Sequence, residues 1–261
     1  MTTYLVTGAT GRIGTPTTAR LHDEGHEVRA LSRRSGPGLV TGDLLTGAGV
    51  GVGVGEFGGE AERGSTNVFA GVDVVIHLAT TNGANDIQVT KNLFEAAARA
   101  HVEHVVLLSI VGIDRIPMGF YKQRVEIEEI ALDSGVPLTL QRATQFHPFV
   151  EAMFTAQRFS PVIIRPSIRF QPIATEEVAD RLVTLAAGDP AGRVDDIGGP
   201  EQLTAAHLLD AWKRATGRHR PSVPLRVPGK LFKAFADGEN LVPGTGFGKQ
   251  TFAQFLAEKY S

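Results

Sequence analysis

The sequence contains no cysteine and, across 261 residues, no long hydrophobic run. The absence of cysteine excludes a disulfide framework, a thiolate nucleophile and metal sites with cysteine ligands. The longest apolar stretch, residues 105–113, is interrupted by Ser109 and Gly112, and the opening MTTYLVTGATG lacks the basic and apolar regions of a signal peptide. We therefore expect a cytoplasmic protein without a membrane partner.

Neither sign of charge is in excess, because 26 Lys and Arg stand against 28 Asp and Glu, for a formal charge of -2. Such a balance gives no global field to attract nucleic acid. One basic cluster in the second half lacks interleaved aromatic residues and is typical of a solvated face; it consists of Lys213, Arg214, Arg218, His219, Arg220 and Arg226. We therefore expect no nucleic-acid partner.

Two kinds of catalytic centre find no support in the sequence. No G-x-S-x-G motif is present, so a serine hydrolase would lack its nucleophile elbow. The histidine pairs at 22 and 26 and at 101 and 104 have helical spacing, but no third ligand is suggested. We therefore expect no metal site.

Apolar strand-like segments alternate with helix-like segments through the first 145 residues. The predicted strands are residues 4–7, 27–31, 72–78, 105–109 and 138–142, and the predicted helices are residues 13–24, 87–100 and 121–134. This alternation predicts an α/β fold, a doubly wound parallel sheet of the Rossmann type covered by helices on both faces.

The pattern changes after residue 145, where prolines interrupt short apolar pieces. Helix-like stretches cover residues 176–187, 204–216 and 251–259, and a strand-like stretch covers residues 193–197. We predict a nucleotide-binding domain over residues 1–145 and a smaller substrate lobe over residues 146–261, with the strand at 193–197 returning to the first sheet.

A glycine-rich stretch, GAGVGVGVGEFGG at residues 47–59, has seven glycines in thirteen positions. That composition is too costly in conformational entropy for a regular helix or strand, so we predict a surface loop. The alternative is a phosphate-binding loop, although the stretch neither follows a strong strand nor opens a clear helix.

Residues 8–14, GATGRIG, lie between the first predicted strand and the first predicted helix. At such a turn the backbone N–H groups and the positive end of the helix dipole would meet a dinucleotide pyrophosphate. At the end of the second strand, where an NAD-selective fold has an acidic residue, this chain has Ser32, Arg33 and Arg34. Guanidinium groups there would pair with a 2′-phosphate, so we expect NADPH rather than NADH; the alternative is a solvated basic turn.

Further motifs extend this pattern over nearly the whole chain. They are LVTGATGRIG at 5–14, VRALSRR at 28–34, GDL at 42–44, GVDVVIHLAT at 71–80, HVVLLSIVGIDRIP at 104–117, LQRATQFH at 140–147 and DIGGPE at 196–201. Together they resemble the NmrA-like, atypical branch of the short-chain dehydrogenase/reductase superfamily.

The resemblance implies a set of cofactor-binding residues. Those that would hold the pyrophosphate are Gly8, Thr10, Gly11, Arg12, Ile13 and Gly14. Those that would hold the 2′-phosphate are Arg33 with Ser32 or Arg34, and Asp43 and Leu44 would contact the adenine. Leu78, Ala79 and Thr80 would line the path to the nicotinamide.

The sequence departs from this superfamily at its catalytic pair. Its reductases use Tyr-x-x-x-Lys, in which the ammonium lowers the pKa of the phenol and the phenol protonates the substrate oxygen. The aligned residues here are Phe120 and Arg124. Arg124 can still hydrogen-bond a ribose, and Tyr121 is adjacent to the missing phenol, although one residue of helix turns a side chain by about 100°.

Other candidate residues end the neighbouring strands. Ser109 stands where relatives have a site residue, or it simply hydrogen-bonds the backbone. By resemblance Gln145, Phe146 and His147 would face the substrate, and His147 is the one that titrates near neutrality; the alternative is a structural histidine before Pro148. Several phenylalanines would suit an apolar or aromatic substrate; they are Phe146, Phe149, Phe154, Phe159 and Phe170.

We therefore predict an NADPH-dependent reductase, a monomer or homodimer, that acts on a small organic carbonyl, quinone or conjugated acceptor. A catalytically silent NADP(H)-binding sensor is the first alternative, and the loss of the Tyr-x-x-x-Lys pair favours it. A non-redox cyclase or isomerase on the same fold is the second alternative.

Overall fold

The computed structural model describes residues 1–51, 67–81, 83–226 and 228–261. The glycine-rich stretch therefore lies outside the described residues beyond position 51. Contacts divide the chain into two units: Met1–Ser109, Gln123–Gln141 and Val178–Val194 form the first, and Ile110–Lys122, Arg142–Glu177 and Asp195–Ser261 form the second. The chain thus passes between the units several times, whereas the prediction had one boundary after residue 145 and one strand, at 193–197, that returns to the first sheet.

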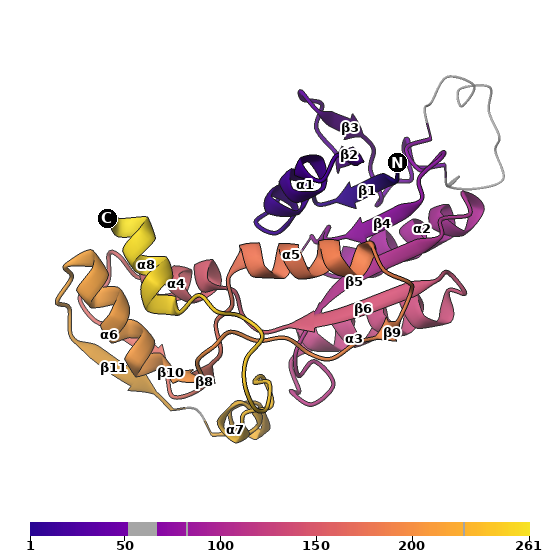
Figure 1. The fold of residues 1–261 in the computed structure, drawn as a ribbon. Helices are drawn as coiled ribbons and strands as arrows, with labels where there is room; N and C mark the ends of the chain where they lie inside the picture. Colours follow the sequence, from indigo (N-terminus) through magenta and orange to yellow (C-terminus); the bar gives the residue numbers. More distant parts are fainter. Residues whose placement is uncertain (52–66, 82, 227) are drawn as a thin grey trace. The chain divides into compact units, whose positions relative to one another are not determined.

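A seven-stranded sheet forms the centre of the first unit (Figure 1). Its strands are β1 (Thr3–Thr7), β2 (Glu27–Ser32), β3 (Leu39–Thr41), β4 (Val74–His77), β5 (His104–Ile110), β6 (Leu138–Ala143) and β9 (Gly192–Arg193). Their order is β3-β2-β1-β4-β5-β6-β9, with parallel pairing. This is the doubly wound order of a Rossmann fold, so the predicted fold class is confirmed.

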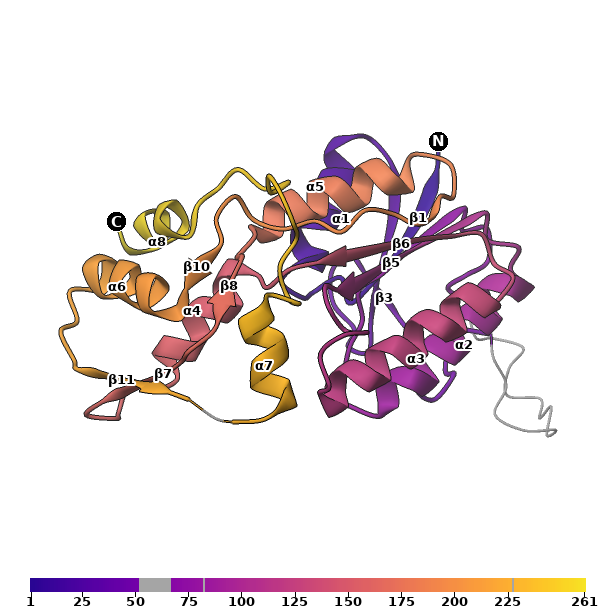
Figure 2. The same cartoon turned by 90° about the horizontal axis from the view of Figure 1, so that it is seen from below.

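Helices cover both faces of the sheet (Figure 2). The helices α1 (Gly14–Asp23) and α5 (Thr175–Ala186) lie on one face, and α2 (Asn85–Arg99) and α3 (Gly119–Asp133) lie on the other. The buried side of α2 carries Val89, Leu93, Phe94 and Ala97 at helical spacing. These side chains pack in one core with apolar residues of the strands, among them Leu5, Val75 and Leu107.

Two strands of the seven-stranded sheet differ from the sequence prediction. The strand predicted at residues 193–197 is shortened to β9, after which Ile197 makes only an isolated bridge with Ala143. Asp195 and Asp196 lie between these two contacts, and Asp is a poor strand residue, so regular pairing is interrupted there. The strand β3 was not predicted, because three residues between Gly38 and Gly42 are too few to show periodicity.

The second unit has its own core around Trp212, which is buried against Phe154 and Phe252. The helices of this unit are α4 (His147–Thr155), α6 (Ala205–Thr216), α7 (Lys230–Asp237) and α8 (Phe252–Tyr260). Two small sheets pair β7 (Ile163–Pro166) with β11 (Ser222–Leu225) and β8 (Arg169–Phe170) with β10 (Leu203–Thr204). Of the predicted phenylalanines, Phe154 and Phe170 are core residues, whereas Phe159 is 86% exposed.

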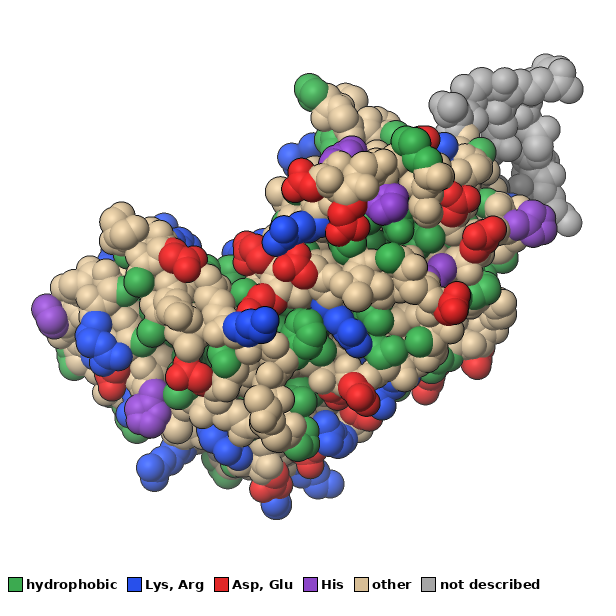
Figure 3. All heavy atoms as spheres, viewed as in Figure 1, with side chains coloured by type: hydrophobic (Ala, Val, Ile, Leu, Met, Phe, Trp, Pro, Cys, Tyr) green, Lys and Arg blue, Asp and Glu red, His purple; other side chains and the backbone are tan. Residues whose placement is uncertain are grey.

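The surface carries both signs of charge. Figure 3 shows Lys and Arg side chains interspersed with Asp and Glu on one face. Within the predicted basic cluster, Arg220 donates to the carbonyl oxygens of Gln157 and Ser160, and Arg218 lies over the Trp212 ring. Across the described ranges, no helix has the length and apolar character needed to cross a bilayer.

Candidate functional site

The turn between β1 and α1 packs so tightly that two of its glycines have no room for a side chain. Gly8 has a positive φ of 68°, and a Cβ there would lie 2.7 Å from the carbonyl oxygen of Leu78. A Cβ on Gly14 would lie 2.2 Å from the carbonyl oxygen of Gly8. No side chain caps the start of α1 at Ile13. Backbone N–H groups at this turn are therefore suited to an anion.

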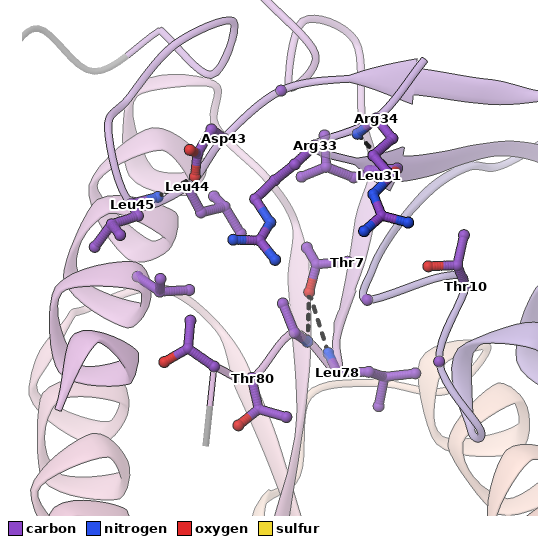
Figure 4. Close-up of a pocket in the computed structure, with 17 residues that line it drawn as sticks. Thr7, Thr10, Leu31, Arg33, Arg34, Asp43, Leu44, Leu45, Leu78 and Thr80 are labelled. Atoms are coloured by element: carbon purple, nitrogen blue, oxygen red, sulfur yellow. Dashed lines mark hydrogen bonds between the residues drawn. The ribbon is translucent and has the colours of Figure 1, made fainter. Parts of the chain in front are cut away.

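A pocket of about 400 Å³ opens beside this turn (Figure 4). It is lined at the carboxyl ends of β1, β2 and β4, the usual place for a ligand in an open α/β sheet. The predicted residues that line it are Gly8, Thr10, Gly11, Ser32, Arg33, Arg34, Asp43, Leu44, Leu78, Ala79 and Thr80. The remaining predicted cofactor residues do not line it: Arg12 is exposed, and Ile13 and Gly14 are buried in support of the turn.

Six lining residues were missed by the sequence analysis: Thr7, Leu31, Gly42, Leu45, Thr81 and Val89. Thr7 and Leu31 end predicted strands, so their position at the carboxyl edge of the sheet could have identified them. Leu45 and Val89 come from a loop and a helix, and no local pattern shows that these two segments approach each other.

Two guanidinium groups extend into the pocket from the end of β2 (Figure 4). The Ser32 hydroxyl accepts a hydrogen bond of 3.0 Å from the backbone N–H of Arg34 and so holds the turn. Among the described residues neither Arg33 nor Arg34 forms an ion pair. Two uncompensated positive charges at one end of a pocket suit a phosphate group.

The loop after β3 is held by a buried amide. Asn92 on α2 donates to the carbonyl oxygens of Leu44 and Leu45, at 2.6 and 3.2 Å. Asp43 accepts a hydrogen bond of 2.9 Å from the backbone N–H of Leu45. Asn92 was not predicted as a functional residue, yet it bonds to Leu44, one of the two residues predicted to contact an adenine, and to Leu45, whose N–H bonds to the other, Asp43.

A buried Thr7 and His77 pair fixes the other wall. The Thr7 hydroxyl oxygen accepts from the N–H groups of Leu78 and Ala79, each at 3.1 Å, so its own proton is directed to His77 Nδ1, 2.7 Å away. Burial, and to a lesser degree the Arg124 charge, lowers the pKa of His77 from 6.5 to about 4. The ring is therefore neutral near pH 7 and acts as an acceptor for Thr7.

Arg124, at the position of the missing lysine, is paired with a buried carboxylate. Its Nη2 lies 2.7 Å from Asp86 Oδ2 and 2.6 Å from the Thr80 hydroxyl. Asp86 also accepts from the hydroxyl groups of Thr80 and Thr81, both at 2.6 Å, and from the backbone N–H of Thr81. Burial alone would raise the pKa of Asp86, but these hydrogen bonds and the Arg124 charge lower it below its usual value.

The second unit brings Tyr121 and Gln145 together. Tyr121 is buried, its phenol is hydrogen-bonded to the Gln145 side chain, and burial raises its pKa. The Gln145 Oε1 atom is also buried, and it has no hydrogen-bond partner within the described part of the chain. The same holds for the hydroxyl of Ser109 at the end of β5, so the alternative of a backbone hydrogen bond for Ser109 is not seen there.

His147 has a different environment from Tyr121. Its side chain is 1% exposed, its Nε2 is bonded to the carbonyl oxygen of Gln250 at 3.0 Å, and its ring stacks on Phe255. Burial lowers its pKa. Phe146 precedes His147 as the N-cap residue of α4 and is half-buried. In the described ranges, no group of three or more His, Asp or Glu side chains could hold a metal ion.

Comparison with known proteins gives one family and several fold relatives. Residues 2–242 match the NmrA-like family. The (4-alkanoyl-5-oxo-2,5-dihydrofuran-3-yl)methyl phosphate reductase of Streptomyces griseus is 31% identical over 220 residues, which are 82% of this chain and 74% of the reductase.

Two solved structures show the same fold at low identity. NADPH-dependent quinone oxidoreductase QOR2 of Escherichia coli, complexed with NADPH, has a TM-score of 0.74 at 17% identity and covers 99% of this chain and 100% of its own. WbmH of Bordetella bronchiseptica, in complex with NAD+, has a TM-score of 0.72 at 14% identity and covers 98% of this chain and 96% of its own.

Proposed function

The chain belongs to the NmrA-like family, and from this premise we propose that it is an NAD(P)-dependent oxidoreductase that uses NADPH. The acceptor we propose is a small organic carbonyl, quinone or conjugated compound. The relatives named as a reductase and as an NADPH-dependent quinone oxidoreductase support this proposal. The observation that carries it is a single pocket with the Gly8 turn and the Arg33 and Arg34 guanidinium groups in its wall.

The residues of the pocket fit a dinucleotide that carries a 2′-phosphate. The backbone around Gly8 and Gly11 would hold the pyrophosphate, because both glycines line the pocket and bring backbone without a side chain to its wall. Arg33 and Arg34 would hold the 2′-phosphate, and the loop at Asp43 and Leu44 would contact the adenine. When bound, NADPH supplies a hydride to the acceptor.

We assign Tyr121 as the donor of the proton that the substrate takes up in this reduction. Burial raises its pKa, so the phenol stays protonated near pH 7, and the hydrogen bond to Gln145 fixes its orientation. His147 is a weaker assignment, because its ring is neutral and is already bonded to the carbonyl oxygen of Gln250.

The test is NADPH oxidation with a panel of quinones, ketones and enones, with wild type and Tyr121→Phe compared. We expect steady turnover by wild type with at least one class, and a fall in kcat of about 100-fold in Tyr121→Phe. His147→Asn is the parallel variant and should keep its rate. If Tyr121→Phe kept the wild-type rate and pH profile, Tyr121 would not be the proton donor.

The sensor alternative is favoured by one observation, the replacement of the superfamily's catalytic pair by Phe120 and Arg124. It predicts tight binding without turnover on every acceptor, and a preference between NADPH and NADP+. That pair of results would exclude the reductase and support the sensor.

A further inference from the structure

The buried carboxylate of Asp86 organises one wall of the pocket. Its side chain is 3% exposed, and that of its partner Arg124 is 12% exposed. Thr80 and Thr81, which both bond to this carboxylate, are lining residues of the pocket. The carboxylate thus joins three segments: the residues after β4, the first turn of α2 and the helix α3.

We propose that Asp86 is a positioning residue for the nicotinamide-bearing half of the cofactor. By holding Thr80, Thr81 and Arg124 in one arrangement, it would fix the wall that this half contacts. The inference rests on the proposed function, since it takes the pocket to be a dinucleotide site. It goes beyond that function because Asp86 lies outside the glycine turn, the basic strand end and the catalytic pair.

The hydrogen bonding explains why a carboxylate is needed at this position. Asp86 Oδ1 accepts from the N–H and the hydroxyl of Thr81, and Oδ2 accepts from the Thr80 hydroxyl and from Arg124. An asparagine offers only one acceptor oxygen, and its amide nitrogen would face donors. The change Asp86→Asn therefore releases part of the wall without removing volume.

The charges give the pocket a polarity along its length. The Asp86 carboxylate compensates the positive charge of Arg124, so this ion pair adds no net charge to the Thr80 and Thr81 end of the pocket. Arg33 and Arg34 form no ion pair among the described residues, and they outnumber Asp43, the acidic residue in the lining of the pocket, so this part of the wall carries a net positive charge. A dinucleotide with a 2′-phosphate is thereby favoured in one orientation, with its adenosine end at Arg33 and Arg34.

The energetics of buried ion pairs support positioning over simple stabilisation. Removing the two charges from water costs about as much free energy as their attraction returns. A buried ion pair therefore stabilises the fold no more than apolar side chains of the same shape would. The pair at Asp86 and Arg124 restricts geometry more than it adds stability. A positioning role thus predicts a change in ligand binding that is selective for one half of the ligand.

The experiment measures the binding of two probes to the whole protein by calorimetric titration. NADPH spans the full pocket, whereas adenosine 2′,5′-bisphosphate carries only the adenosine half. For Asp86→Asn we expect the Kd of NADPH to rise at least about tenfold and the Kd of the bisphosphate to stay within about twofold of wild type. Glu95→Gln is the matched control, because it removes an exposed carboxylate paired with Arg99 on the same helix, and it should change neither value.

A second variant covers the case in which Asp86→Asn does not fold. The double variant Asp86→Asn with Arg124→Gln removes both charges, leaves no unpaired buried ion and should give the same selective loss. Unchanged NADPH affinity, or an equal loss for both probes, would overturn the positioning role. Failure of wild type to bind either probe would instead overturn the proposed function, so the two failures are distinguishable.

Discussion

The proposed preference for NADPH depends on Arg33 and Arg34. Replacing both with glutamine removes the two guanidinium groups that we assign to the 2′-phosphate. We expect the Kd of NADPH to rise about 10- to 100-fold, while that of NADH changes by less than about twofold.

Titrations of the double variant with both cofactors check this prediction. Arg20→Gln is the matched control, since Arg20 is exposed, pairs with Asp180 and does not line the pocket. An equal loss of NADPH and NADH affinity would show that the two arginines maintain the structure of the turn after β2 and do not bind the 2′-phosphate.

His77 makes the folded protein sensitive to acid. Its pKa in the folded state is about 4, below the ordinary 6.5, so between these values the unfolded chain binds a proton that the folded chain does not. Its contribution to stability is therefore complete above about pH 6.5 and declines as the pH falls toward 4, by at most about 1.4 kcal/mol per pH unit. The pKa of Asp86 is lowered from its ordinary 3.8, so this carboxylate affects stability only below about pH 3.8. That range lies below the one in which His77 contributes.

Urea denaturation at pH 7 and pH 5 tests this assignment. Burial also lowers the pKa values of His104 and His147, which contribute to stability with the same sign, so the comparison must isolate His77. We expect His77→Asn to lose less stability than wild type between the two pH values. His22→Asn is the control at an exposed position and should follow wild type; parallel losses in all three proteins would refute the assignment.

At the scale of the element, the start of α1 depends on Gly14. Helix propensity alone predicts that Gly14→Ala stabilises the protein by about 1 kcal/mol. The structure predicts the opposite sign, because the added Cβ would lie 2.2 Å from the Gly8 carbonyl oxygen and the turn would have to move. We expect a loss of about 1–3 kcal/mol in the free energy of unfolding and a loss of NADPH binding.

Gly25→Ala at the other end of α1 is the comparison variant. Gly25 has a φ of 80°, but nothing lies within 4 Å of a Cβ there. This variant should lose about 1–2 kcal/mol from backbone strain and keep its NADPH affinity. A Gly14→Ala protein that is more stable than wild type would contradict the packing described for the turn.

Sequence patterns predicted the longer elements well and the short ones poorly. The helix α2 shows its buried face in the spacing of Val89, Leu93 and Ala97, so its existence could be predicted. The strands β3 and β9 have three and two residues, and tertiary pairing alone defines them. The helix α4 begins at His147 with Pro148 in its first turn. It was not predicted, because the prolines of that region interrupt the helical spacing of apolar residues.

At the scale of the whole molecule, the parts of the site that sequence could not predict are those made by distant pairs. Asn92 bonds to a carbonyl 48 residues earlier in the chain, and Asp86 bonds to an arginine 38 residues later. Asp86 and Asn92 both lie on the amphipathic helix α2, where a polar residue is normally predicted to face solvent. The glycine turn and the basic strand end were predictable because their chemistry is local and their spacing is short.

The division into two units also follows from distant contacts. Residues 178–194, late in the chain, belong to the first unit, and residues 110–122, from its middle, belong to the second. The sequence predicted one boundary after residue 145 and one strand that returns to the first sheet, because the other crossings are defined by contacts between residues far apart in the chain.

Side-by-side titration of the wild-type protein with NADPH, NADH and NADP+ tests the central claim most directly. A pocket that combines the Gly8 turn with Arg33 and Arg34 predicts micromolar binding of NADPH, with NADH weaker by at least about tenfold, or about 1.4 kcal/mol. Equal affinity for NADPH and NADH would contradict the role of the arginines. No binding of any of the three would contradict the dinucleotide site itself and leave a non-redox activity on this fold as the better explanation.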